Sequence, residues 1–136
     1  MKIIISEKQK LLLILHEALK DKDQNIDGGD LQICSENPLT GFYRDGFCRT
    51  GKNDTGSHTV CAKVTQEFLD FTETVGNYLR LNVGDRWCLC ASRWKQAFDV
   101  GLAPPVILSS TNVVALSYLS MKDLSIQALD SIKMSL

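Results

Sequence analysis

Residues 84–101 read GDRWCLCASRWKQAFDVG and contain the clearest transition from strand to helix in the chain. A glycine–aspartate turn pair opens the segment, and the aromatic, cysteine and leucine residues that follow predict a strand over 86–91. Ser92 is a typical helix cap, the apolar residues after it recur at helical spacing, and Gly101 is a typical stop. The segment therefore predicts a turn, a strand and a helix in direct succession.

Similar signals occur on both sides of this segment. Before it, residues 59–64 alternate side-chain character as a short strand does, and Thr65 starts a helix that Gly76 ends. After it, two prolines open a predicted strand over 106–108. The remaining expected elements are a short helix at 112–116, a brief strand at 117–119 and a last helix that begins at Ser120.

This order of elements predicts an α+β fold in which a small mixed β-sheet packs against several helices. Residues 37–56 are rich in turn formers and predict a long loop region that contains a hairpin. A chain of 136 residues has the ordinary size of one domain, so we expect a single α+β domain over 25–136.

The first 24 residues (1–24) are expected to be an extension that carries an amphipathic N-terminal helix. Ser6 and Gln9 have the spacing of a capping box, and an apolar stripe follows them. Apolar residues cover more than half of the circumference of this helix. The helix is therefore either deeply buried or pairs with a second subunit in a homo-oligomer. Its apolar runs are too short for a signal peptide or a membrane span, which predicts no membrane partner.

Composition restricts the class of protein further. Hydrophobic residues make up 44% and charged residues 23%, as in ordinary globular proteins, and the net charge is −1. Proteins that bind nucleic acid usually carry a basic surface, so this balance predicts no nucleic-acid partner. Five cysteines without a secretory segment favour free, reduced thiols and a cytoplasmic protein.

Five motifs carry a resemblance to a known family: NIDGGDLQICS at 25–35, TGFYRDGFCRTG at 40–51, GSHTVCA at 56–62, GDRWCLCASRW at 84–94 and APPV at 103–106. They resemble the bacterial family called domain of unknown function 2237 over about residues 25–133. The chain departs from the family in its N-terminal extension, in Phe47, where relatives often carry a second cysteine, and in a short segment at 78–83. The resemblance implies no activity, because the family has none assigned.

Cysteine and histidine residues of these motifs are the candidate catalytic groups. Cys88 and Cys90 alternate along the predicted strand, which places them on one face about 7 Å apart. Cys90 also lies near a helix N-terminus, whose dipole stabilises a thiolate. His58 is the one imidazole in the family region and so the candidate base. Buried structural thiols are the simpler interpretation, since free cysteines often pack as small hydrophobic residues.

Two pairs of neighbouring charged residues are the candidate ligand-binding groups. They are Arg44 with Asp45, and Asp85 with Arg86, and each pair adjoins a glycine. Aspartate beside glycine usually closes a turn through nearby backbone N–H groups. In a binding site the two arginines would hold an anion.

Three hypotheses for function follow, and the sequence leaves open whether the protein is an enzyme. The first is a small intracellular module that binds a small molecule or a protein. The second is a cysteine-dependent enzyme with Cys88 or Cys90 as nucleophile or redox thiol and His58 as base. The third is a structural zinc domain, although no closely spaced cysteine pair of the zinc-knuckle type occurs, and we assign no metal ligands. No cofactor is required by the sequence.

Overall fold

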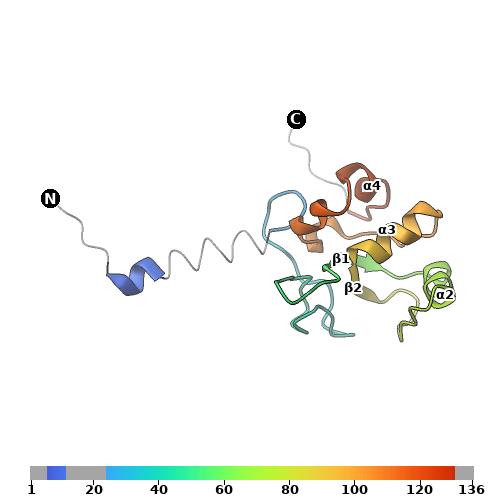
Figure 1. The fold of residues 1–136 in the computed structure, drawn as a ribbon, viewed down its shortest axis with the longest axis horizontal. Helices are drawn as coiled ribbons and strands as arrows, with labels where there is room; N and C mark the ends of the chain where they lie inside the picture. Colours follow the sequence, from blue (N-terminus) through green and yellow to red (C-terminus); the bar gives the residue numbers. More distant parts are fainter. Residues whose placement is uncertain (1–5, 12–23, 131–136) are drawn as a thin grey trace.

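The protein is described by a computed structural model, which covers residues 6–11 and 24–130. The described elements of the domain are β1 (His58–Lys63), α2 (Gln66–Thr74), β2 (Arg86–Cys90), α3 (Ala91–Asp99), the 3₁₀ helices η1 (Leu108–Ser110) and η2 (Val113–Ser117), and α4 (Met121–Ile126) (Figure 1). A small antiparallel sheet with several helices confirms the α+β fold class. Within the described ranges, no helix is long and apolar enough to cross a membrane.

The sheet consists of β1 and β2, which pair antiparallel. In this register Cys61 lies opposite Cys88, and His58 lies opposite Cys90. The two strands agree with the predicted ones to within one residue at each end. Their pairing brings two of the family motifs, 56–62 and 84–94, into direct contact.

The two further strands expected from the sequence do not form. Val106 makes only single-residue bridges, antiparallel to Ala62 and parallel to Ala128. The chain then bends into η1, because the Asp130 carboxylate accepts the next two backbone N–H groups of the η1 segment at 2.6 and 2.9 Å. The segment at 117–119 lies at the end of η2 and in the turn after it. Among the described residues, parallel and antiparallel pairing therefore occur together only at Val106, instead of in the mixed sheet that the sequence predicts.

Side-chain caps start two helices where the sequence predicts them. Oγ1 of Thr65 accepts the backbone N–H of Phe68 at 3.1 Å and begins α2. Oγ of Ser120 accepts the backbone N–H of Asp123 at 3.1 Å and begins α4. Each bond satisfies a donor that the first helical turn would otherwise leave without a partner.

The start of α3 differs from the prediction. Cys90 occupies the cap position and its side chain accepts no backbone N–H of the helix, whereas Ser92 lies inside the first turn. The strand runs directly into the helix, because the backbone N–H of Ala91 donates to the carbonyl of Ser57 at 3.0 Å. The prediction of Ser92 as the cap is therefore wrong, and the free cysteine takes that place.

A helical turn spans residues 7–11 at the N-terminus. The capping box is confirmed, since the Ser6 backbone N–H donates to Oε1 of Gln9 at 3.1 Å and the Gln9 backbone N–H donates to Oγ of Ser6 at 3.2 Å. The rest of the expected helix and of its apolar stripe lies outside the described residues. The predicted homo-oligomer through this helix therefore stays a prediction.

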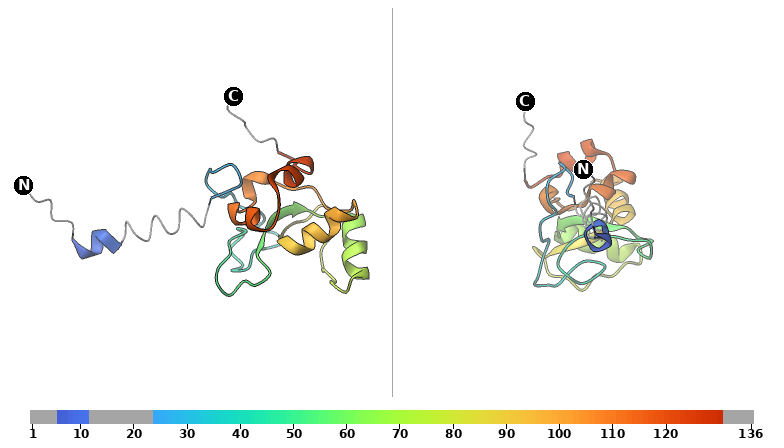
Figure 2. Two further views of the ribbon diagram at one scale, coloured as in Figure 1. Left: turned by 45° about the horizontal axis from the view of Figure 1, so that its top comes forward. Right: turned by 90° about the vertical axis from the view of Figure 1, so that its left-hand side faces the viewer.

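The main apolar core lies between the sheet and the helices. Figure 2 shows α2, α3 and α4 packed around the strands, with the start of the 24–57 segment beside the 3₁₀ helices η1 and η2 and the rest of the segment away from α2 and α3. Trp94 of α3 is fully buried, stacks on Phe98 at 5.1 Å between ring centroids, and donates its indole N–H to the Pro104 carbonyl at 3.1 Å. Phe68 and Leu124 bring α2 and α4 into the same core.

The 24–57 segment is tied to the sheet by two disulfide bonds. Cys34 pairs with Cys61 of β1, and Cys48 pairs with Cys88 of β2. Because the two strand cysteines are cross-strand neighbours, both bridges lie side by side in a second buried cluster. The segment itself contains turns rather than the predicted hairpin strands.

The prediction of free cysteines is therefore wrong for four of the five. Only Cys90 has a free thiol. Spacing along one strand cannot reveal a pairing whose partners come from loops 27 and 40 residues away in sequence. The predicted reducing, cytoplasmic location was inferred from free thiols and loses that support.

Buried polar side chains complete the attachment of the loops. Oγ1 of Thr40 accepts the backbone N–H of Cys88 at 2.9 Å. The side-chain amide of Asn112 donates to the Cys48 carbonyl at 3.1 Å. Thr40 and Asn112 are both fully buried, so these bonds satisfy backbone groups that water does not reach.

Candidate functional site

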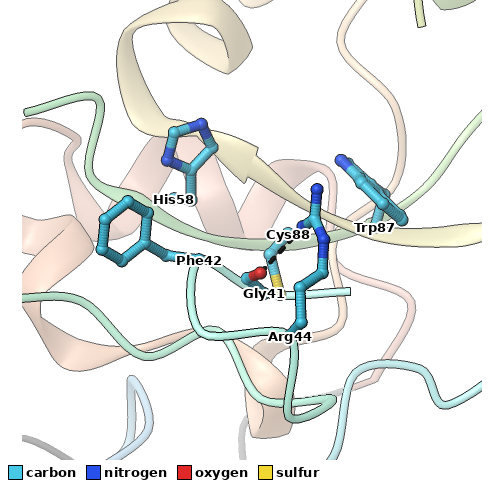
Figure 3. A pocket seen from close by; sticks show the side chains of 6 residues that line it. All are labelled: Gly41, Phe42, Arg44, His58, Trp87 and Cys88. Carbon is cyan, nitrogen blue, oxygen red and sulfur yellow. Dashed lines mark hydrogen bonds between the residues drawn. The ribbon is translucent and has the colours of Figure 1, made fainter. Parts of the chain in front are cut away.

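A pocket of about 340 Å³ lies where the loop segment meets the sheet (Figure 3). Its volume is at the lower end of the range of small-molecule sites, roughly 300–1,000 Å³. The loop and both strands contribute the side chains. The lining residues are Gly41, Phe42, Arg44, His58, Trp87 and Cys88.

Arg44 supplies the positive charge of this pocket. It sits in a turn with a φ of +54°, and its guanidinium carbon lies 5.0 Å from the centre of the Trp87 ring. Nη1 donates to the Gly41 carbonyl at 2.8 Å, which fixes the side chain over the tryptophan (Figure 3). Among the ion pairs of the described residues, none involves Arg44. Its charge is therefore not neutralised by a neighbouring carboxylate there.

His58 forms the opposite wall. Its ring stacks on Phe42, with centroids 6.4 Å apart and planes 13° apart. Nδ1 lies 2.6 Å from Oδ1 of Asp54. The Asp54 side chain is 1% exposed and that of His58 is 40% exposed, so the buried carboxylate holds a ring that reaches the surface. A carboxylate only accepts hydrogen bonds, so Nδ1 carries the proton and Nε2 is the basic nitrogen of the neutral ring.

Asp54 is a carboxylate at neutral pH. Burial raises the pKa of Asp54, but hydrogen bonds outweigh that effect and hold the pKa below its ordinary value of 3.8. The donors are the His58 backbone N–H at 2.9 Å, the His58 ring and the Thr50 hydroxyl at 3.0 Å. The aspartate therefore fixes the position of the imidazole through two separate groups of the same residue.

The free thiol of Cys90 belongs to the residue that lies opposite the same histidine across the strands. A methyl group built on Gly56 would lie 2.8 Å from Cε1 of His58 and 3.5 Å from Sγ of Cys90, so both side chains border the space over this glycine. Sγ also lies 3.2 Å from Oγ of Ser92. The structure thus brings together the predicted base and one of the two predicted nucleophiles.

Cys88, the other predicted nucleophile, lies in a different environment. Its sulfur is bonded to Cys48 and is buried, although the residue lines the pocket. A disulfide sulfur has no thiolate to act as a nucleophile. Only Cys90 keeps a thiol beside His58.

The remaining predicted ligand-binding residues lie outside the pocket. Asp45 forms an ion pair with Arg49 at 3.1 Å and also accepts a backbone N–H two residues on. Asp85 accepts the backbone N–H of Asn82 at 2.8 Å, so it closes a turn. Arg86 is exposed on β2. Of the two predicted arginines, the structure brings Arg44 to the pocket.

Sequence reasoning missed Asp54 and the two aromatic walls, Phe42 and Trp87. Asp54 stands four residues before His58 in a loop that reads as an ordinary turn. The four-residue spacing between Asp54 and His58 is the signal that could have identified the aspartate, because a short loop can bring an acidic side chain back to the histidine. Trp87 is only half-buried, so its ring is open to the pocket.

Three cysteine sulfurs also cluster, but not as free ligands. Sγ atoms of Cys34, Cys48 and Cys61 lie within 4.8 Å of one another. All three belong to disulfides, and a metal ion binds the thiolate. A structural zinc site would require both bridges to be reduced.

Comparison with curated proteins found no match. Comparison with protein families matched residues 24–128 to the family described as "Uncharacterized protein conserved in bacteria", DUF2237. The matched range contains the pocket, both disulfides and the group formed by Asp54, His58 and Cys90. Because the match covers most of the sequence, this chain belongs to the DUF2237 family.

Proposed function

We propose that the protein binds a small organic anion in the pocket between the loop segment and the sheet. The guanidinium of Arg44 would hold the charged group, the His58 ring would form the opposite wall, and the rings of Phe42 and Trp87 would pack against the body of the ligand. The observation that carries this proposal is the cation of Arg44, which faces the pocket without a carboxylate partner among the described residues.

The chemistry of these groups favours a carboxylate or a phosphate. A guanidinium has five N–H donors in a planar fork that matches two oxygens of an anion. Among residues 6–11 and 24–130, Arg44 donates one hydrogen bond, to the Gly41 carbonyl. Stacking on Trp87 keeps the fork in a fixed orientation. The volume of about 340 Å³ limits the ligand to a small molecule with a planar or short apolar body.

Fluorescence titration with benzoate and with its neutral analogue benzamide tests the proposal. Trp94 is fully buried, so a ligand in the pocket changes mainly the emission of Trp87. We expect a saturable change with benzoate and a much weaker one with benzamide. Inorganic phosphate serves as a second probe and should compete with benzoate.

Two variants with the same charge change separate the site from a general charge effect. Arg44→Gln should weaken benzoate binding by roughly 10–100-fold, because hydrogen bonds to charged groups contribute about 1.5–3 kcal/mol. Arg86→Gln, one residue from Trp87 but outside the pocket, should leave binding unchanged. Equal binding of benzoate and benzamide, or equal effects of the two variants, would overturn the proposal.

A further inference from the structure

We propose that Cys90, His58 and Asp54 form a thiol centre that transfers acyl groups from small anionic esters or thioesters. This inference rests on the proposed function, because the anion pocket would hold the charged end of the substrate. His58 connects the two, since it lines the pocket and also lies opposite Cys90 across the strands.

Each member of the group has one role. Cys90 is the nucleophile, as the only cysteine of the chain with a free thiol. His58 is the base, because its Nε2 is left basic by the bond between Nδ1 and the aspartate. Asp54 is a positioning residue: its buried carboxylate binds both the ring and the backbone N–H of His58.

The absence of a side chain at Gly56 leaves room for the His58 ring and the Cys90 sulfur beside this residue. A methyl group there would lie 2.8 Å from the His58 ring, which is closer than real carbon contacts, and 3.5 Å from the sulfur. The absence of a side chain at Gly56 therefore lets the imidazole and the sulfur both come close to this residue.

The N-terminus of α3 favours a negative charge near the Cys90 sulfur. α3 has nine residues and begins directly after Cys90, whose sulfur contacts the Ser92 hydroxyl but accepts no backbone N–H of the first turn. The first-turn N–H groups of a helix lack partners within the helix and favour negative charge.

The reaction balances without a redox partner. His58 takes the proton of the Cys90 thiol, and the thiolate attacks the carbonyl carbon of the substrate. The bond from that carbon to the leaving oxygen or sulfur breaks, and the leaving group takes the proton from His58. A water molecule, deprotonated by His58, then attacks the S-acyl cysteine, and an acid and the free thiol are released. The net change is hydrolysis, and Asp54 stays ionised throughout.

Alkylation without reducing agent tests the thiol centre alone, because Cys90 is then the single reactive cysteine. We expect iodoacetamide to modify native Cys90 at least about tenfold faster than the same cysteine in urea. His58→Gln should remove this advantage. Ser92→Ala is the matched control, since it removes the other neighbour of the sulfur and should preserve the rate.

Testing the positioning role of Asp54 requires a measurement that a general loss of stability would not change. Asp54→Asn should lower the alkylation rate and also move the pH at which the rate is half-maximal, because the amide no longer fixes a protonated Nδ1. Gly56→Ala should lower the rate by displacing the His58 ring. If native and unfolded Cys90 react equally fast, the thiol centre is wrong.

Ester turnover tests the substrate class and separates the two proposals. Mono-4-nitrophenyl succinate, an anionic ester, should give a burst of nitrophenolate and an acyl adduct on Cys90, whereas 4-nitrophenyl acetate should react more slowly. Arg44→Gln should remove only the preference for the anionic ester. Fast acylation without that preference would overturn the anion pocket and leave the thiol centre. Benzoate binding without any acylation would overturn the thiol centre and leave the pocket.

Discussion

The two halves of the domain are stabilised by different means. Residues 24–57 contain turns and no regular strand or helix, and two disulfides together with buried hydrogen bonds attach them to the sheet. Residues 58–126 contain the strands and helices, and a continuous apolar core, to which the loop half contributes Ile26, holds them. The pocket and the Cys90 thiol lie along the boundary between the halves.

This difference explains how a segment without secondary structure can position a site. Ordering a loop costs conformational entropy at every residue, and the loop buries little apolar surface to offset that cost. Covalent bridges to neighbouring strands lower that cost by restricting the unfolded chain. Arg44 and Asp54, which come from the loop half, can therefore keep fixed places opposite His58 and Trp87.

The largest expected effect comes from removing a bridge. The double variants Cys34→Ala/Cys61→Ala and Cys48→Ala/Cys88→Ala should each lower the free energy of unfolding by roughly 3–4 kcal/mol, since each bridge closes a long loop. Urea unfolding measures the loss. The unmodified chain should show one reactive thiol per molecule without reductant and five after reduction in denaturant. A count of five in the native, unreduced protein would contradict the disulfide assignment.

A core substitution in the other half should act differently. Leu124→Ala removes a fully buried side chain and should cost roughly 2–5 kcal/mol through lost burial and a residual cavity. The native protein should still show a single reactive thiol, because the bridges are untouched. Thermal unfolding combined with thiol titration checks both results. Reduction of either bridge by added dithiothreitol below the unfolding transition would show that the halves are less distinct than proposed.

Asp54 should make the loop half sensitive to acid. The folded pKa lies below the ordinary value of 3.8, so the folded state binds this proton more weakly than the unfolded state does. The resulting stability is fully present above the unfolded-state pKa and is lost as pH falls through the folded pKa. Asp54→Ala should cost about 2 kcal/mol at neutral pH by removing hydrogen bonds to a charged group, and less in acid. Urea unfolding at neutral pH and at pH about 3 measures the difference, and an equal cost at both values would contradict it.

The smallest expected effect concerns the helix caps. Thr65→Ala should destabilise the protein by about 1 kcal/mol, because a first-turn N–H of α2 loses its acceptor. Ser92→Ala should cost less, since Ser92 lies inside α3 rather than at its cap. Chemical unfolding of the two variants side by side gives the comparison. If Ser92→Ala destabilises the protein more than Thr65→Ala does, Ser92 acts as the helix cap after all.

The helical half could be predicted from local pattern. The caps at Thr65 and Ser120 and the positions of both strands follow from contacts between residues a few positions apart, as does the capping box at Ser6 in the N-terminal segment. The errors occur where a long-range contact competes with a local signal. Val106 has the sequence of a strand residue, but the Asp130 carboxylate binds the N–H groups that a longer strand would have used.

The site could be predicted only in part for the same reason. Cys90 and His58 were proposed together, and the register of β1 and β2 places them opposite each other. Cys88 could not be separated from Cys90 by spacing, because its partner Cys48 lies 40 residues away. Asp54 was missed because an isolated aspartate in a polar loop has no periodicity that distinguishes it.

The order of the bridged cysteines has a practical consequence for proteolysis. The bond from Cys34 to Cys61 and the bond from Cys48 to Cys88 interlace, so a single cut anywhere between residues 34 and 88 leaves at least one bond across the break. Lys52 is exposed, and cleavage after it is spanned by both bridges. A trypsin-nicked protein should therefore migrate as one species until reductant is added. Its two fragments would stay side by side across the site.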